Sequence, residues 1–284
     1  MNNSSSTIHY PLSTIALSIA ASDPTGGAGI QADLKVLQTF GVHGLSAITA
    51  ITAQNTLGVR SVWPVPAESL QSQLNALRED IPFSIIKIGA LGSREAVEVV
   101  VDFVAGGEYT VILDPVIQPT SGRELTSSDA VDMMVNRLFP HVTLLTPNIL
   151  EAEVLLGRKI ASFDEMEDAA RSILALGPKS VLLKGGHVNS VDRVQDLFLD
   201  HEGATTFSSP RISGDLHGSG CMLSSAIAAL LVHDADMLNA IEQAREFVHQ
   251  VRASAMQIGG GDDRSSPRGQ RIASPISFIP DFVA

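Results

Sequence analysis

Short runs of apolar and β-branched residues alternate with helical patterns along most of the 284-residue chain. Several of these runs are apolar without alternation, which is typical of parallel strands covered on both faces. The pattern predicts βαβ units, and therefore an α/β fold whose largely parallel central sheet has helices on both faces. The predicted strands cover residues 14–20, 45–53, 84–88, 110–113, 142–145 and 180–183, followed by a meander of 195–199 and 205–207.

The helix predicted after residue 161 has recognisable start and end signals in the sequence. Ser162 followed by Glu165 matches a capping box, and Gly177 with Pro178 marks the end of the helix. Apolar residues at helical spacing indicate that one stripe of this helix faces the sheet. The stripe consists of Met166, Ala169, Ala170, Ile173 and Leu174.

Composition supports one globular domain, because 44% of the residues are hydrophobic and 18% are charged, enough apolar material for a sizeable core. Polar and glycine-rich segments are confined to the two ends. We therefore expect a flexible leader over residues 1–13, a single folded domain over 14–258, and a C-terminal loop and tail over 259–284.

Charge and cysteine content narrow the possible partners. The chain has 19 basic and 31 acidic residues, a net charge of −12, which argues against binding to nucleic-acid phosphates. Its one cysteine, Cys221, cannot form an internal disulfide, so nothing points to an oxidising compartment. No segment has the charge and length of a secretory signal or a membrane span. We expect a cytoplasmic protein that acts on a small molecule.

A glycine-rich segment, residues 23–29 with the sequence DPTGGAG, follows the first predicted strand. Its glycines let the backbone approach a ligand at the carboxyl end of a strand, where open α/β sheets bind small molecules. A tight turn formed by Asp23 and Pro24 explains the segment equally well. A Rossmann dinucleotide loop does not, because Ala32 stands where the third glycine belongs.

A second loop, residues 216–222, also leads into a helix. Gly218, Ser219 and Gly220 would aim free N–H groups at one point, where the helix dipole favours negative charge. Cys221 would lie in the first turn, where the same field lowers the pKa of a thiol. The alternative is that Cys221 is a small buried hydrophobe behind a flexible entry turn, with His217 as a capping or packing residue.

Two further segments follow strands. Asn148 and Glu151, three residues apart at a helix start, could hold a hydrated Mg²⁺, although the same spacing also suits a capping box. Lys184 precedes a double glycine and could reach a phosphate, although a simple turn is the alternative. All four segments would gather at one edge of a parallel sheet, and together they suggest phosphoryl transfer. Neither a P-loop nor a protein-kinase signature is present.

Residues 19–35, IAASDPTGGAGIQADLK, and 48–56, ITAITAQNT, carry a family resemblance. Further matching segments follow in the same order along the chain. The sequence closely resembles the hydroxymethylpyrimidine/phosphomethylpyrimidine kinases of thiamine biosynthesis, over roughly residues 15–257. The further segments are 87–89, 114–116, 146–152, 184–187 and 217–221.

The resemblance implies a ribokinase-like fold and two successive ATP-dependent phosphorylations of 4-amino-5-hydroxymethyl-2-methylpyrimidine, with ATP and Mg²⁺ as cofactors. It assigns Gln54 to the aminopyrimidine ring, with Ala28 and Val116 lining the ring pocket and Asp23 in the same substrate site. Ala21 and Ala90 depart from the residues common in the family at the pocket.

The resemblance also assigns roles to the phosphate side. It makes 218–220 the anion hole and Cys221 the base on the substrate hydroxyl, at a position held by Asp in related sugar kinases. It places Lys184 near the nucleotide phosphates, and Asn148 and Glu151 in a metal-water motif. The alternatives are a pyridoxal or pyridoxine kinase of the same fold and a non-catalytic pyrimidine-binding protein. The sequence leaves the oligomeric state open, with a homodimer as the assembly under consideration.

Overall fold

The structure is a computed structural model that describes residues 14–117, 125–186, 192–212, 216–257 and 271–272. The expected leader over 1–13 and nearly all of the expected tail over 259–284 lie outside the described residues. His187 of the lysine–glycine segment lies outside them as well.

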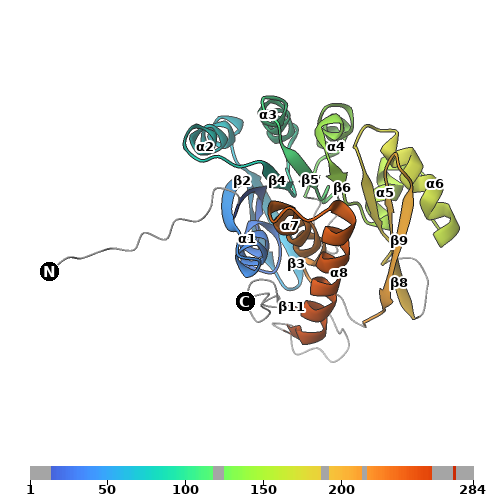
Figure 1. Cartoon of the computed structure of the whole chain (residues 1–284). Helices are drawn as coiled ribbons and strands as arrows, with labels where there is room; N and C mark the ends of the chain where they lie inside the picture. Colours follow the sequence, from blue (N-terminus) through green and yellow to red (C-terminus); the bar gives the residue numbers. More distant parts are fainter. Residues whose placement is uncertain (1–13, 118–124, 187–191, 213–215, 258–270, 273–284) are drawn as a thin grey trace.

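In the part of the chain that the structure describes, a sheet of nine strands forms the centre of the fold, in the order β3-β2-β1-β4-β5-β6-β7-β8-β9 (Figure 1). Its middle strands, from β2 to β7, pair in parallel, whereas β3 at one edge and β8 and β9 at the other pair antiparallel. The strands are β1 (Ile15–Ser22), β2 (His43–Asn55), β3 (Gly58–Pro64), β4 (Ile85–Ile88), β5 (Thr110–Leu113), β6 (Leu144–Leu145), β7 (Val181–Lys184), β8 (Arg193–Leu199) and β9 (Ala204–Pro210), with a separate pair β10 (Met256–Gln257) and β11 (Arg271–Ile272).

Helices cover both faces of the large sheet. Figure 1 shows α1, α7 and α8 on one face and α2, α3 and α4 on the other. Each face has its own hydrophobic core, and the side chains of α5 and α6 belong to the same core as those of α2, α3 and α4. The helices are α1 (Gly29–Thr39), α2 (Ala67–Asp80), α3 (Arg94–Ala105), α4 (Ser128–Met133), α5 (Ile149–Leu156), α6 (Phe163–Leu174), α7 (Ser219–Val232) and α8 (Met237–Ser254). No helix in the described ranges is long and apolar enough to cross a membrane.

The alternation of side chains along each strand explains the two cores. On β1, Ala16 packs with α1, α7 and α8, whereas Leu17 and Ile19 pack against the helices of the opposite face. On β5, Ile112 belongs to the first core and its neighbour Leu113 to the second. Strands buried on both faces need apolar residues at every position, and this confirms the predicted fold class.

Local predictions succeeded only in part. Helix α6 begins after Ser162 as predicted and buries its predicted stripe except for Leu174, which is partly buried, but the predicted capping box is wrong. The Glu165 carboxylate accepts a hydrogen bond from the N–H of Ala161 at 2.8 Å, and the Ser162 side chain makes no capping bond. The strand predicted over 142–145 is only two residues long, and the sequence analysis gave no ranges for β3 or for the helices α2, α3, α4 and α8.

Candidate active site

A cavity of about 450 Å³ lies at the carboxyl ends of the parallel strands, beside the start of α7. All four segments singled out in the sequence contribute to its walls, so the prediction that they share one edge of the sheet is confirmed. The eleven predicted site residues all line this cavity: Asp23, Ala28, Gln54, Val116, Asn148, Glu151, Lys184, Gly218, Ser219, Gly220 and Cys221.

The start of α7 has the features of an anion site. Gly218 is its N-cap and has a φ of +74°, and a Cβ there would lie 1.9 Å from the carbonyl oxygen of Gly27. Glycine is therefore required for the two glycine loops to approach each other this closely. The first turn itself contains no acidic residue, so none of its own side chains offsets the positive end of the helix dipole at the cavity.

A buried ion pair lies against this helix start. Nζ of Lys184, at the end of β7, is 2.8 Å from Oδ1 of Asp114, which follows β5, and the two side chains are 15% and 4% exposed. A Cβ on Gly220 would lie 3.0 Å from the Asp114 carboxylate and 3.1 Å from the Lys184 ammonium. Although burial alone would lower the pKa of Lys184, the carboxylates of Asp114 and Glu151 raise it, so the ammonium stays charged beside the helix.

Asn148 and Glu151 form a capping box at the start of α5. The Asn148 side-chain oxygen accepts from the N–H of Glu151 at 2.9 Å, and the Glu151 carboxylate accepts from the N–H of Asn148 at 2.8 Å. The structural alternative stated for this pair is thus confirmed. Burial raises the pKa of Glu151 to about 7, with Asp114 adding to the rise and Lys184 opposing it.

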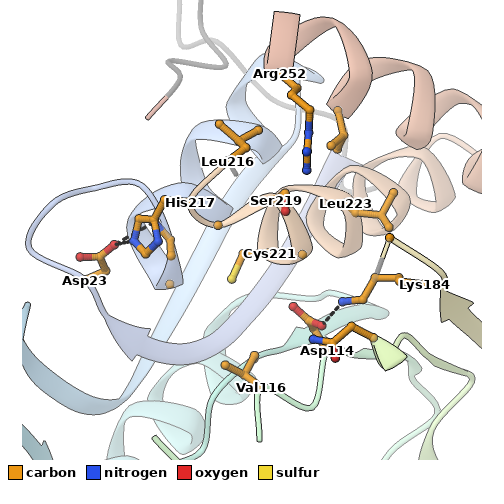
Figure 2. Close-up of a pocket in the computed structure, with 18 of the residues that line it drawn as sticks. Asp23, Asp114, Val116, Lys184, Leu216, His217, Ser219, Cys221, Leu223 and Arg252 are labelled. Carbon is orange, nitrogen blue, oxygen red and sulfur yellow. Dashed lines mark hydrogen bonds and ion pairs between the residues drawn. The ribbon is translucent and has the colours of Figure 1, made fainter. Parts of the chain in front are cut away.

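Cys221 lies between the two hydrogen-bonded pairs of Figure 2, one formed by Asp23 and His217 and the other by Asp114 and Lys184. The predicted lowering of its thiol pKa is wrong. Burial raises the pKa to about 11, and the nearby carboxylates of Asp33 and Asp114 raise it further, against the opposing charge of Lys87. Desolvation and two carboxylates outweigh the positive charge around the helix start.

Asp23 anchors the loop after β1. Its carboxylate accepts hydrogen bonds from the N–H and hydroxyl of Thr25, the N–H of Ala28 and Nε2 of His217, at 2.8–2.9 Å. Burial alone would raise the pKa of Asp23, but the bonds from His217 and Thr25 lower it. His217 was considered a capping or packing residue; instead its ring joins Asp23 to Gln54, whose amide nitrogen lies 3.2 Å away.

Small apolar residues form the floor near Gln54. Ala21, Ala50 and Ala90 make a buried cluster against which Val116 packs. Val116 has a φ of +39°, which a β-branched residue rarely adopts, so its backbone is strained where it meets the cavity. Ala21 and Ala90, the two departures from the family at the pocket, both line the cavity.

The wall of the cavity formed by α8 contains basic residues that the sequence analysis missed. Arg245, His249 and Arg252 follow one another at helical spacing along α8 and line the wall. Arg245 pairs with Asp196 of β8 at 2.7 Å, and Figure 2 shows Arg252 extending from α8 toward the start of α7. The spacing of these residues along one helix was the available signal.

Comparisons with known proteins find relatives that match most of the chain. The sequence profile of the family described as "Phosphomethylpyrimidine kinase" matches residues 23–265. The hydroxymethylpyrimidine/phosphomethylpyrimidine kinase of Aquifex aeolicus (strain VF5) is 38% identical over 249 residues, or 87% of this chain and 97% of that protein.

Two solved structures are similar over most of the chain. The phosphomethylpyrimidine kinase of Clostridium difficile 630 has a TM-score of 0.74 and 36% identity, over 83% of this chain and 98% of that one. The pyridoxal kinase of Bacillus subtilis, solved as an ADP complex, has a TM-score of 0.80 and 30% identity, over 93% of this chain and 98% of that one.

Proposed function

The chain belongs to the phosphomethylpyrimidine kinase family and is a phosphotransferase of thiamine biosynthesis, and we propose that the cavity beside α7 is its active site. There, 4-amino-5-hydroxymethyl-2-methylpyrimidine accepts a phosphoryl group from ATP, and its monophosphate then accepts a second one. In the first step the substrate hydroxyl oxygen bonds to the γ-phosphorus, the bond from that phosphorus to ADP breaks, and the hydroxyl proton is released.

The observation that carries the proposal is the close approach of the Lys184–Asp114 pair to Gly220, where a Cβ would lie 3.0 Å from the carboxylate and 3.1 Å from the ammonium. A helix N-terminus without a side chain at Gly220 and a charged lysine converge on one place. Phosphoryl transfer builds charge on the transferred group, and donors that are already in position stabilise it without reorganisation. Asp114 keeps the Lys184 ammonium directed at that place.

The substrate side follows from Gln54 and its neighbours. An amide offers one donor and one acceptor, which matches the amino group and adjacent ring nitrogen of an aminopyrimidine. Ala28 and Val116 provide small apolar surface for the ring. Cys221, in the first turn of α7, is proposed to face the hydroxyl and take its proton; because burial raises the pKa of this thiol to about 11, the thiolate is the minor form near neutral pH.

The donor set near α5 fits a hydrated Mg²⁺. Asp114 and Glu151 are buried carboxylates that line the cavity, and Mg²⁺ prefers oxygen ligands while keeping several waters. Within the described ranges no group of three or more His, Cys, Asp or Glu side chains is placed to hold a metal. Asn148 and Glu151 would therefore hold the ion through water and the ATP phosphates, whose charge it neutralises when bound.

The direct test is to incubate the purified chain with ATP, Mg²⁺ and the hydroxymethylpyrimidine and to resolve products by mass. We expect the monophosphate first and the diphosphate later. Absence of both products, with the protein folded by circular dichroism, would contradict the proposed function.

Pyridoxal phosphorylation is the second candidate activity. The observation in its favour is the TM-score of 0.80 to a pyridoxal kinase over 93% of this chain. Pyridoxal lacks the adjacent amino group and ring nitrogen that Gln54 would pair with. We expect kcat/KM for pyridoxal to be at least about tenfold below that for the aminopyrimidine, the scale of one unsatisfied buried hydrogen-bonding group. A spectrophotometric assay with both substrates decides between them.

A homodimer is proposed through the β2–β3 hairpin. Ile51, Leu57 and Trp63 are 53%, 57% and 56% exposed, and Ile51 is paired with Trp63 across the two strands. An exposed apolar patch at a sheet edge fits a two-fold interface, in which the same patch is used twice. Light scattering should give the mass of two chains, and Trp63→Glu should reduce it to one. Leu238→Glu, at an exposed leucine on α8, is the control and should leave the dimer intact.

A further inference from the structure

Three side chains meet at the mouth of the substrate pocket. His217 directly precedes Gly218, the N-cap of α7, whereas Asp23 follows β1 and Gln54 lies near the end of β2. Nε2 of His217 is 2.8 Å from Oδ2 of Asp23 and 3.2 Å from the amide nitrogen of Gln54. One ring nitrogen is therefore shared between a carboxylate and an amide.

The carboxylate decides where the hydrogen of that nitrogen lies. Asp23 accepts hydrogen bonds from Thr25 and Ala28 as well as from His217, and these bonds favour its ionised form. An ionised carboxylate only accepts, so Nε2 of His217 carries a hydrogen and donates it to Asp23. A ring nitrogen that carries a hydrogen cannot accept one from Gln54.

At the other end of the Gln54 amide, two hydrogen-bond acceptors face each other in the same unfavourable way, and the second group there is the Thr52 hydroxyl. This hydroxyl lies 2.9 Å from the carbonyl oxygen of Ser22 and 3.4 Å from the amide oxygen of Gln54. The hydroxyl has a single hydrogen, and the shorter bond to Ser22 takes it. The lone pairs of the hydroxyl are left facing the amide oxygen, which also only accepts.

A half turn of the Gln54 amide removes both conflicts. The two ends of an amide are nearly equal in size, so the surrounding donors and acceptors decide its direction. After the turn, the amide oxygen faces the Nε2–H of His217 as a second, more distant acceptor of the hydrogen that Asp23 accepts at 2.8 Å, and the nitrogen donates to Oγ1 of Thr52. No donor then faces a donor, and no acceptor faces an acceptor, between Asp23 and Ser22.

We propose that His217 is a positioning residue that holds the amide oxygen of Gln54 on the His217 side and thereby fixes the direction in which the aminopyrimidine binds. This inference rests on the proposed function, in which Gln54 pairs with the pyrimidine. Figure 2 shows His217 between Asp23 and the start of α7. The ring therefore lies next to both the proposed substrate site and the proposed anion site.

The direction of the amide has a chemical consequence. Once bound to His217 and Thr52, the Gln54 amide keeps one lone pair on its oxygen and one hydrogen on its nitrogen. The substrate's amino group must then lie at the His217 end and its ring nitrogen at the Thr52 end. The hydroxymethyl group is attached beside the amino-bearing carbon, away from that ring nitrogen. It is thereby directed toward the loop that contains Gly218, where the phosphoryl group is transferred.

The test compares two substrates with opposite hydrogen-bonding edges. In the 4-oxo analogue, a carbonyl and a ring N–H replace the amino group and ring nitrogen, so donor and acceptor are exchanged. The wild type should strongly prefer the 4-amino substrate, measured as the ratio of the two kcat/KM values. His217→Phe roughly keeps the size of the ring but removes its N–H, so only the 3.4 Å contact with Thr52 is left to hold the direction of the amide. We expect the ratio to fall at least about tenfold, mainly through KM.

His217→Gln is the matched control, because its side-chain N–H can reach Asp23. We expect it to keep the ratio within about threefold of the wild type, since the donor is retained. A wild type that phosphorylates the 4-amino substrate while His217→Phe leaves the ratio unchanged would overturn this inference alone. A wild type that phosphorylates neither pyrimidine would overturn the proposed function as well.

A second measurement needs no substrate. In the free protein with ¹⁵N-labelled histidine, the nitrogen chemical shifts of the neutral His217 ring show which nitrogen carries the hydrogen. We expect the hydrogen on Nε2, and Asp23→Asn should weaken that preference because an amide can both donate and accept. A hydrogen on Nδ1 in the wild type would overturn the inference, because His217 would then accept from Gln54.

Discussion

Nζ of Lys87 lies 2.8 Å from both carboxylate oxygens of Asp33, and neither side chain is exposed to solvent. The hydroxyls of Ser18 and Ser225 donate to the same carboxylate at 2.6 and 2.9 Å. This network joins β4, α1, β1 and α7 beneath the cavity. It holds α7, whose first turn is the proposed anion site, against the sheet.

The network predicts a large stability loss when only one charge is removed. Lys87→Met leaves Asp33 buried without its counter-ion, so we expect the free energy of unfolding to fall by about 3–5 kcal/mol. The double variant Lys87→Met with Asp33→Leu removes both charges and should recover much of the loss. Urea unfolding of the three proteins measures this. A single variant as stable as the wild type would show that the pair contributes little.

The raised pKa of Glu151 predicts that the stability of the fold depends on pH. The pKa is raised from 4.5 to about 7, so the fold favours the protonated carboxyl. This contribution is fully present below pH 4.5 and is lost as the pH rises through about 7, at a cost of roughly 3 kcal/mol for a shift of this size. Glu151→Gln stays neutral, so it should gain stability relative to the wild type between about pH 5 and 8. Parallel stability curves for the two proteins would contradict the prediction.

The raised pKa of the Cys221 thiol predicts that kcat depends on pH. Because the pKa of the thiol is raised to about 11, the thiolate fraction grows about tenfold for each pH unit below that value. If the thiolate takes the hydroxyl proton, kcat should rise with pH above neutrality. Cys221→Ser should lose most activity and this rise while KM changes little, since a serine hydroxyl is a far weaker base. A variant within about threefold of the wild-type kcat would show that the loose transition state needs no base.

Gln54 predicts an effect on substrate affinity. Gln54→Ala leaves the amino group and ring nitrogen of the pyrimidine without partners, at about 1–3 kcal/mol for each unsatisfied group. KM for the aminopyrimidine should therefore rise by tens of fold, while KM for ATP stays the same. Steady-state kinetics with each substrate varied in turn measure both constants. An unchanged KM for the pyrimidine would mean that Gln54 does not contact the ring.

The sequence predicted the features that depend on neighbouring residues. Unbroken apolar runs identified strands such as 110–113 without any structure, and the glycines before Cys221 identified the start of α7. The sequence analysis gave no range for α2, which buries only Leu70 and Leu74 fully and Leu77 in part, so its apolar stripe is narrow. It missed β3 because this strand is half exposed at the edge of the sheet.

The contacts that set the chemistry depend on distant parts of the chain. Lys87 and Asp33 are 54 residues apart, and His217 and Asp23 are 194 apart. The thiol pKa of Cys221 could not be inferred from its helix position, because burial and carboxylates from other elements outweigh the helix. Residue spacing predicted that the candidate site residues gather at one edge of the sheet, but it did not predict the hydrogen bonds among them.

The central claim, that phosphoryl transfer takes place at the start of α7, is tested most directly by Gly220→Val. A Cβ at this position would lie 3.0 Å from the Asp114 carboxylate and 3.1 Å from the Lys184 ammonium, and the rest of the valine would fill the place proposed for the phosphoryl group. We expect kcat for pyrimidine phosphorylation to fall at least about a hundredfold, the scale of losing one preorganised donor. The circular dichroism spectrum of the same sample should stay native-like. Undiminished product formation by the folded variant would contradict the account.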